Sequence, residues 1–445
     1  MRKICVIRHW VKVSLLVFFS FWEGMGSLPL HAQVKGTIVG PGSERYPIAI
    51  SPLKNLVQKE DGGRLSEGIA DVIARDLELS GWFRVLDRSA YIEPPQKSGI
   101  TPGSFDFKDW STIGAEGLVK GGYTLAGEEL SVELRLFDVF QGKQIVGKRY
   151  VGKPKDFRQI AHRFADEIVM QFTGVPGVFN TRLAYVSTAG GRFKEIYVSH
   201  LDGSEKVQVT HNRTINLFPS WSPDGRSILY TSFKERTPSL YLFDFFSGRE
   251  TKLSSGSLNL RGRWSPNGKF LALPLERQGN VEIYLLDSAG KMVRRLTQNP
   301  GIDVSPAWSP DGNSLVYVSN SSGSPQLYIL DVASGKSQRL TYTGSYNTSP
   351  DWSPKGDKIA YTGRVAGRFN IFVISAQGGE PQMLTANSGD NEDPSWSPDG
   401  RYIAFTSNRK GPYQLYMMQA GGENQQRLTG SGGDDTNPSW SPRLE

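Results

Sequence analysis

Two clusters of acidic residues are the side chains in this sequence with the greatest potential for chemistry. The first is Asp390-Asn391-Glu392-Asp393, and the second is Asp434-Asp435. Neighbouring carboxylates can act as a general acid and base, and their oxygen atoms can bind calcium. A solvated polar loop or a loop that contacts a protein partner has the same composition. The two clusters therefore leave solvation, partner binding, and a calcium or catalytic site as alternatives.

Other patterns for nucleophilic, metal or cofactor chemistry are missing from the sequence. The chain has one cysteine, Cys5, and no Gly-x-Ser-x-Gly motif or phosphate-binding glycine loop that opens a helix. Its five histidines, His9, His31, His162, His200 and His211, are scattered. His200 and His211 are expected to face solvent rather than to bind a metal. We therefore expect no catalytic residue, no metal site and no cofactor.

A repeated motif must position both acidic clusters, because each cluster lies just before one of its copies. Trp-Ser-Pro recurs at intervals of 43, 44, 44, 44 and 44 residues. The six tryptophans are Trp221, Trp264, Trp308, Trp352, Trp396 and Trp440. Each interval holds three further apolar segments of strand length, such as 402–406 and 414–418. A repeat of about 40–45 residues with four strands is a propeller blade.

The residues of the motif have structural roles. Proline presets φ for a tight turn, and the glycine after it can adopt positive φ. Tryptophan supplies a large apolar surface for packing against the next blade.

The two ends of the repeat region predict how the ring closes. No strand follows Trp440, whereas three strands between 183 and 210 lack a tryptophan strand. The C-terminal strand should therefore complete the blade begun by those three, which gives an all-β six-bladed β-propeller with WD40-like repeats.

The preceding residues predict a separate α/β domain with a mixed sheet and helices. Apolar periodicity predicts helices over 65–79 and 156–172. Strands are expected over 45–53, 82–86, 118–125, 130–137 and 143–151, with a loop over 91–104. The predicted organisation is a signal peptide over 1–32, the α/β domain over 33–173, a linker over 174–178 and the propeller over 179–445.

The first residues read as an export signal. Four basic residues precede an apolar run over 13–22, which is about half the length of a membrane-spanning helix, and Leu30-His31-Ala32 resembles a cleavage site. Removal of 1–32 discards four basic residues, one acidic residue and the cysteine, so the net charge falls from +7 to +4. A chain without thiols suits an oxidising compartment, and the scattered positive charge argues against nucleic-acid binding. The predicted location is the periplasm.

The combination of these features resembles the TolB family of the Tol-Pal envelope system. An exported α/β domain precedes six Trp-Ser-Pro-Asp-Gly-type blades, and Val34-Lys35-Gly36-Thr37-Ile38-Val39 followed by 46–50 looks like the start of that family. The resemblance implies a non-enzymatic periplasmic adaptor. Such an adaptor binds Pal, the peptidoglycan-associated lipoprotein, at the propeller mouth and TolA through its N-terminal segment. It supports outer-membrane integrity and constriction during cell division. It associates with membranes, and with other outer-membrane proteins, only through its partners.

The resemblance also implies partner-binding residues. The loops before the tryptophans form the mouth, for which the candidates are Leu258, Asn259, Arg261, Asp303, Asn347, Glu392 and Asp435. The candidates for the N-terminal contact are Val34, Lys35, Gly36, Thr37, Ile38 and Val39. The second copy reads Arg261-Gly262-Arg263-Trp264 and lacks the proline found two residues before the other tryptophans. The alternative function is a periplasmic propeller hydrolase or lyase that acts on glycan or peptide in a polar central funnel.

Overall fold

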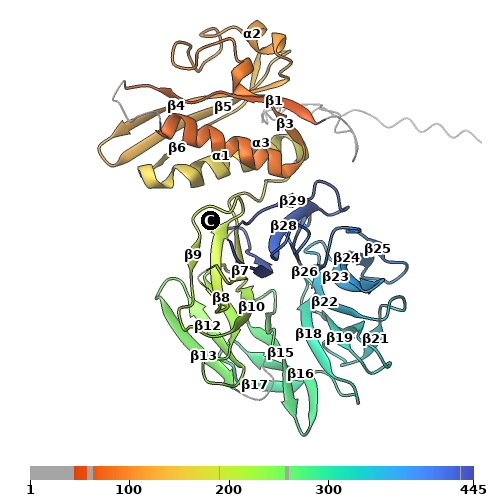
Figure 1. Cartoon of the computed structure of the whole chain (residues 1–445). Coiled ribbons are helices and arrows are strands. Elements are labelled where there is room, and N and C mark those ends of the chain that lie inside the picture. Colours follow the sequence, from red (N-terminus) through yellow and green to blue (C-terminus); the bar gives the residue numbers. More distant parts are fainter. Residues whose placement is uncertain (1–44, 58–63, 190, 256–259, 431, 445) are drawn as a thin grey trace, which may run out of the picture. The chain divides into compact units, whose positions relative to one another are not determined.

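The computed structural model describes residues 45–444 apart from 58–63, 190, 256–259 and 431 (Figure 1). The predicted signal peptide, the N-terminal candidates Val34 to Val39, and Leu258 and Asn259 lie outside the described residues. The described residues belong to one compact unit, which contains both an α/β domain and a β-propeller. None of the described helices is long and apolar enough to cross a membrane.

The α/β domain is built on a mixed sheet of strand order β3-β1-β4-β5-β6, with β2 paired to β4. Strand β1 is parallel to β3 and β4, whereas β4, β5 and β6 are antiparallel. The elements are β1 (Tyr46–Ile50), β2 (Lys54–Asn55), α1 (Arg64–Ser80), β3 (Phe83–Val85), η1 (Arg88–Ala90), α2 (Phe107–Thr112), β4 (Gly117–Ala126), β5 (Glu129–Asp138), β6 (Lys143–Gly152), η2 (Pro154–Asp156) and α3 (Phe157–Thr173). The mixed α/β fold predicted from the sequence is confirmed.

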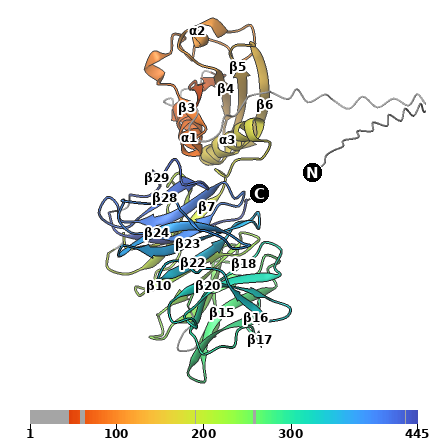
Figure 2. The same cartoon turned by 90° about the vertical axis from the view of Figure 1, so that its right-hand side faces the viewer.

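Helices α1 and α3 cover one face of this sheet, and α2 lies on the other (Figure 2). Ile69 and Ile73 of α1 and Phe164 of α3 are fully buried in the core of the first face. Helix α2 was not predicted. Asp106 caps its N-terminus and buried Trp110 anchors it, so it depends on a tertiary contact rather than on a long apolar stripe.

An ionisable pair lies inside the α1–α3 contact. His162 Nδ1 of α3 is 2.7 Å from Asp76 Oδ2 of α1, and neither residue is exposed. Burial raises the pKa of Asp76 to about 6 although His162 opposes that change. Burial disfavours charged His162, but the carboxylate of Asp76 outweighs it and raises the pKa of the imidazole. The prediction that His200 faces solvent is wrong, because its ring is buried and stacks on His162 at 5.0 Å.

The propeller consists of six four-stranded sheets, which we number as blades 1 to 6 (Figure 1). Blade 1 comprises β10 (Asn216–Trp221), β11 (Ser227–Ser232), β12 (Ser239–Asp244) and β13 (Arg249–Ser255), and blade 2 comprises β14 (Arg263–Trp264), β15 (Phe270–Arg277), β16 (Asn280–Asp287) and β17 (Met292–Arg295). Blade 3 comprises β18 (Asp303–Trp308), β19 (Ser314–Ser319), β20 (Gln326–Asp331) and β21 (Ser337–Arg339), and blade 4 comprises β22 (Asn347–Trp352), β23 (Lys358–Val365), β24 (Arg368–Ser375) and β25 (Gln382–Met383). Blade 5 comprises β26 (Asn391–Trp396), β27 (Tyr402–Ser407), β28 (Gln414–Gln419) and β29 (Gln426–Arg427), and blade 6 comprises β30 (Asp435–Trp440), β7 (Arg182–Ser187), β8 (Glu195–His200) and β9 (Val207–Gln208). The predicted six-bladed fold is confirmed.

The Ser-Pro-x-Gly segment folds as a hydrogen-bonded turn after each of the first five tryptophan strands. In the first copy, Ser222 Oγ accepts the Ser227 N–H at 2.9 Å and donates to Asp224 at 2.6 Å. Gly225 then takes a φ of 69°, which a residue with a Cβ rarely adopts. The third and fifth copies repeat these bonds. The motif is therefore structural in these copies.

Both ends of the propeller meet in blade 6. Strand β30 pairs antiparallel with β7, with Trp440 opposite Leu183 and Asp435 opposite Ser187. Trp440 is 7% exposed, and its indole N–H donates to Thr181 Oγ1 at 2.8 Å. The ring is thus closed by hydrogen bonds between its first and last strands.

The last turn of α1 contacts blade 5. Carbonyl groups at the end of a helix have no partner within that helix. Here Ser80 O accepts hydrogen bonds from Tyr402 Oη at 3.2 Å and Gln419 Nε2 at 3.1 Å. The side-chain amide of Asn424 donates to Leu79 O, and that of Gln426 donates to Glu78 O. The propeller therefore caps the C-terminus of α1.

Candidate functional site

A ring of six left-handed residues lies at the mouth of the channel. Each stands three positions before a tryptophan, and φ lies between 51° and 61° in all six. In five blades the inner strand shifts register at this point, which marks a β-bulge. We call these residues the mouth ring: Phe218, Arg261, Ser305, Ser349, Asp393 and Asn437. Non-glycine residues with positive φ are uncommon and often mark functional sites.

Hydrogen bonds connect four members of the mouth ring. Arg261 donates to Ser349 Oγ at 2.5 Å and to Asp393 Oδ1 at 2.6 Å. Ser349 Oγ lies 2.7 Å from the same carboxylate, and Asn437 donates to its other oxygen at 2.5 Å. The Arg261 guanidinium also lies 5.0 Å from the centre of the Phe218 ring. One cation thus joins blades 1, 2, 4 and 5 across the mouth, and Asn437 extends the network to blade 6.

The two acidic residues of this site have opposite pKa shifts. Burial disfavours ionised Asp393, but the charge of Arg261 and the hydrogen bonds from Ser349, Arg261 and Asn437 outweigh it and lower the pKa. For Glu392, burial and the charge of Asp393 raise the pKa to about 7, despite a hydrogen bond from Tyr413. Asp393 is therefore a stable anion, whereas Glu392 can change its protonation near neutral pH.

The Glu392→Gln variant should be more thermostable than the wild type at pH 8 but not at pH 5. Because the folded pKa of Glu392 lies above its unfolded value, its stabilising contribution is present at low pH and is lost as the pH rises through 7. Glutamine cannot ionise, so we expect its melting temperature at pH 8 to be about 1–2 °C higher. Differential scanning calorimetry at both pH values tests this. Glu423→Gln, an exposed change in the same blade, is the control, and an equal effect at pH 5 and 8 would contradict the explanation.

Three predicted mouth residues lie five positions before a tryptophan and are almost inaccessible. Asp303 and Asp435 are 0% exposed, and Asn347 is 2% exposed. Asn347 donates to Gln326 at 2.9 Å, and Asp303 accepts a bond from Asn299 at 2.6 Å. Asn216 and Asn391 occupy the equivalent buried positions. These side chains hold the loops of the mouth, whereas Arg261 and Glu392 lie at or beside the mouth ring.

A second hollow lies at the opposite ends of the inner strands. A cavity of about 260 Å³ is lined there by the six tryptophans and by the residues directly before them, including Arg263 and Asp351. Asp351 accepts the Trp396 N–H at 2.8 Å. Burial raises the pKa of Asp351 despite the positive charge of Arg263. Among the described residues, no three His, Cys, Asp or Glu side chains are grouped so that they could hold a metal ion.

Sequence reasoning proposed Arg261 of the mouth ring as a binding residue and placed Asp393 in an acidic cluster. It did not single out the other four members, which are chemically diverse: Phe218, Ser305, Ser349 and Asn437. The repeat itself contains a signal for these positions. Five of the six members directly precede a proline, and the residue type at this position differs between copies, whereas the proline and the tryptophan after it recur. An alignment of the six copies with one another would have identified the mouth ring as a variable position next to the recurring Pro and Trp.

Comparison with known proteins supports this architecture over nearly the whole described chain. The model of the TolB beta propeller domain matches residues 169–444, and that of the TolB amino-terminal domain matches residues 36–145. A Tol-Pal system protein TolB from Desulfosudis oleivorans is 44% identical over 264 residues, which cover 59% of this chain and 60% of that protein. Another from Anaeromyxobacter dehalogenans is 36% identical over 62% of this chain and 63% of its own length. The chain thus matches less than two thirds of the length of these relatives.

A solved structure extends the likeness to both domains. The crystal structure of TolB from Acinetobacter baumannii is similar with a TM-score of 0.79 and 28% sequence identity. The match covers 90% of this chain and 97% of the other. The propeller model alone covers more than half of the sequence. The chain therefore belongs to the TolB family.

Proposed function

We propose that this protein is a non-enzymatic periplasmic adaptor of the Tol-Pal system. The mouth ring binds a Pal-like peptidoglycan-associated lipoprotein, and the N-terminal segment over 34–39 binds TolA. In this role the protein maintains outer-membrane integrity and supports envelope constriction during division. Support comes from the family membership, the Tol-Pal names of the relatives and the geometry of the mouth.

The linked Arg261–Asp393 pair carries the proposal. Its side chains are 10% and 16% exposed, so the pair is accessible yet largely desolvated. Charged hydrogen bonds in such surroundings are stronger and more geometrically selective than those at an open surface. Phe218 adds an aromatic face beside the cation. A polar network with an aromatic neighbour is suited to recognising a protein loop, since binding energy concentrates in arginine and aromatic anchors.

The buried and exposed candidates have different roles in this proposal. Arg261 and Glu392 contact the lipoprotein, whereas Asp303, Asn347 and Asp435 fix the loops that present the mouth ring. Leu258 and Asn259 lie three and two residues before Arg261 in the sequence, and they are proposed to contact the lipoprotein as well.

Calorimetric titration with the periplasmic domain of the Pal protein from the same organism tests the mouth. Arg261→Ala should weaken binding at least tenfold, because hot-spot arginines contribute about 2 kcal/mol or more. Phe218→Ala is a second mouth variant that leaves the ion pair in place. Arg249→Ala, at an exposed position on the outer strand of blade 1, is the matched control.

Unchanged affinity of both mouth variants, with melting temperatures near that of the wild type, would overturn the proposed Pal site. The proposed contact between the N-terminal segment and TolA can be tested separately by the same titration method. A mature chain that lacks residues 33–39 should lose binding to a TolA fragment and retain binding to Pal. Retained TolA affinity would place that contact elsewhere.

A further inference from the structure

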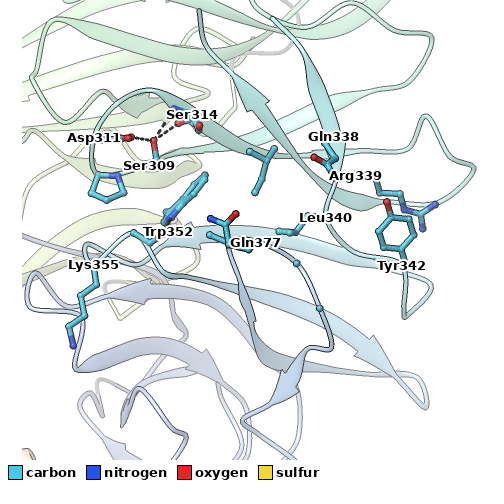
Figure 3. Close-up of a pocket in the computed structure, with 16 residues that line it drawn as sticks. Ser309, Asp311, Ser314, Gln338, Arg339, Leu340, Tyr342, Trp352, Lys355 and Gln377 are labelled. Carbon is cyan, nitrogen blue, oxygen red and sulfur yellow. Dashed lines mark hydrogen bonds between the residues drawn. The ribbon is translucent and has the colours of Figure 1, made fainter. Parts of the chain in front are cut away.

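The groove between blades 3 and 4 is open on the side of the propeller where the tryptophan turns lie. It encloses about 680 Å³ and is lined by residues of both blades, among them Gln338, Leu340, Trp352, Lys355 and Gln377. Figure 3 shows Trp352, Gln377 and Leu340 along its middle, with Lys355 at one end and Arg339 beside Tyr342 at the other. We call it the 3–4 groove. It is formed at the opposite ends of the inner strands from the mouth ring.

Neighbouring blades are packed more closely at three other places in the ring. In blades 2, 5 and 6, the turn between the two outer strands contacts the preceding blade through a glycine. A Cβ placed on Gly203, Gly290 or Gly422 would lie 2.7, 2.3 or 3.1 Å from a leucine carbonyl oxygen of that preceding blade. Nothing lies within 4 Å of a Cβ placed on Gly378, the equivalent glycine of blade 4, or on Gly248 of blade 1. The turn of blade 4 thus stands away from blade 3 and leaves the 3–4 groove open.

The groove between blades 5 and 6 is the equivalent surface two blades further on, and it already binds a protein segment. Residues at the same distance from the tryptophan of their own repeat occupy equivalent positions. By this criterion Gln338 corresponds to Gln426, Leu340 to Leu428, Trp352 to Trp440 and Lys355 to Arg443. Gln426 donates to the carbonyl of Glu78 in α1, and Arg443 donates to the carbonyls of Pro176 and Gly177. The α/β domain and the segment that follows it therefore occupy that groove through their main-chain carbonyls.

The tryptophan between the two blades distinguishes these two grooves from the two in which the indole N–H reaches the preceding blade. Trp308 and Trp396 each donate their indole N–H to a carbonyl of the preceding blade, Arg263 O and Asp351 O. Trp440, in the occupied groove, donates to Thr181 instead. Trp352 donates to Gly356 O of its own turn. The indoles of the occupied groove and of the 3–4 groove thus both lack the contact with the preceding blade, as do those of Trp221 and Trp264, whose N–H groups have no partner among the described residues.

The 3–4 groove retains donors but has lost the acidic group of its counterpart. Gln377 replaces Asp202, which binds Arg158 of α3 in the occupied groove. The side-chain amides of Gln338 and Gln377 make no hydrogen bond to any described residue. The carboxylate of Asp311 is held by Ser309 and by the Asn313 N–H. Unused amide donors and the cations Lys355 and Arg339 therefore face an incoming ligand.

We propose that the 3–4 groove docks a segment of a partner protein that ends a helix, exposes main-chain carbonyls and carries acidic side chains. The carbonyls bind Gln338 and Gln377 as the end of α1 binds Gln426. The acidic side chains pair with Lys355 and Arg339, and an apolar residue covers Trp352 and Leu340. This surface is separate from the mouth and leaves the mouth free to bind its own partner.

A fluorescein-labelled synthetic peptide with the sequence of residues 66–83 tests the proposal by fluorescence anisotropy. It ends a helix, carries four acidic residues and one basic residue, and has the carbonyls that fill the occupied groove. In the intact mature protein its own groove is already filled by α1. We expect saturable binding, a loss of about tenfold in Gln338→Ala/Lys355→Ala, and abolition by Ser314→Trp, which fills the 3–4 groove.

Gln382→Ala is the matched control, since Gln382 is an exposed glutamine at the equivalent position of blade 4. It should bind the peptide as the wild type does, and all variants should keep the wild-type melting temperature within about 2 °C. Absence of saturable binding to the wild type, or equal affinities for Gln338→Ala/Lys355→Ala and Gln382→Ala, would overturn the proposal. Binding of chitotetraose but not of the peptide would also overturn it and assign the groove to a glycan.

Discussion

Removal of residues 437–445 is expected to abolish the cooperative thermal unfolding of the propeller. The deletion takes away most of β30, and with it Trp440 and the pairing to β7. Burial of a tryptophan of this kind contributes about 3–5 kcal/mol, and the exposed edge of β7 loses hydrogen bonds in addition. We expect the calorimetric transition to disappear or its midpoint to fall by more than about 10 °C.

A graded substitution separates ring closure from a general effect of shortening the chain. Trp440→Phe keeps the strand and most of the apolar contact but loses the bond to Thr181. Its midpoint should lie between those of the wild type and the deletion. A deletion variant that unfolds at the wild-type temperature would show that blade 6 does not need β30.

Replacement of Asp76 by alanine should destabilise the α/β domain by about 3–5 kcal/mol, because it leaves a buried imidazole without its carboxylate. The Nε2 atom of His162 is also buried without a hydrogen-bond partner in the described chain. Urea unfolding, followed by circular dichroism at pH 7, measures the loss. A double replacement, Asp76→Val with His162→Leu, should recover much of it, since apolar pairs often replace buried ion pairs at little cost.

Asp71→Ala is the matched control on the same helix. Asp71 pairs with Arg88 at 2.7 Å, but its side chain is 64% exposed, so its loss should cost less than about 1 kcal/mol. If Asp71→Ala and Asp76→Ala lowered the free energy of unfolding by similar amounts, burial of the Asp76–His162 pair would have no special importance for stability.

The fold was predictable because its signals are long or repeated. Six Trp-Ser-Pro copies predicted six blades, and the helix predicted over 65–79 is observed as α1 from Arg64 to Ser80. Helix α2 escaped prediction because six residues make fewer than two turns and show no periodicity. His200 was misplaced because its burial depends on His162, which is 38 residues away in the sequence.

The candidate site was predictable only as a set of loops. Polar composition favoured Asp303, Asn347 and Asp435, yet strand pairing buries them. A β-bulge then interrupts the alternation of faces, so the position three before each tryptophan leaves the regular ladder. Neither the bulge nor the bonds between Arg261 and blades 4 and 5 can be read from one local pattern.

The mouth ring has a consequence for how this surface can diversify. Its six backbone positions are fixed by the same left-handed geometry, while their side chains range from Phe218 to Arg261 and Asp393. The β-scaffold therefore presents six different side chains at one rim, four of which are joined by hydrogen bonds, much as an antibody framework presents varied loops. Asparagine and glycine are the replacements that this backbone accepts most readily. A combinatorial library confined to these positions could select propellers with new binding specificities without redesigning the blades.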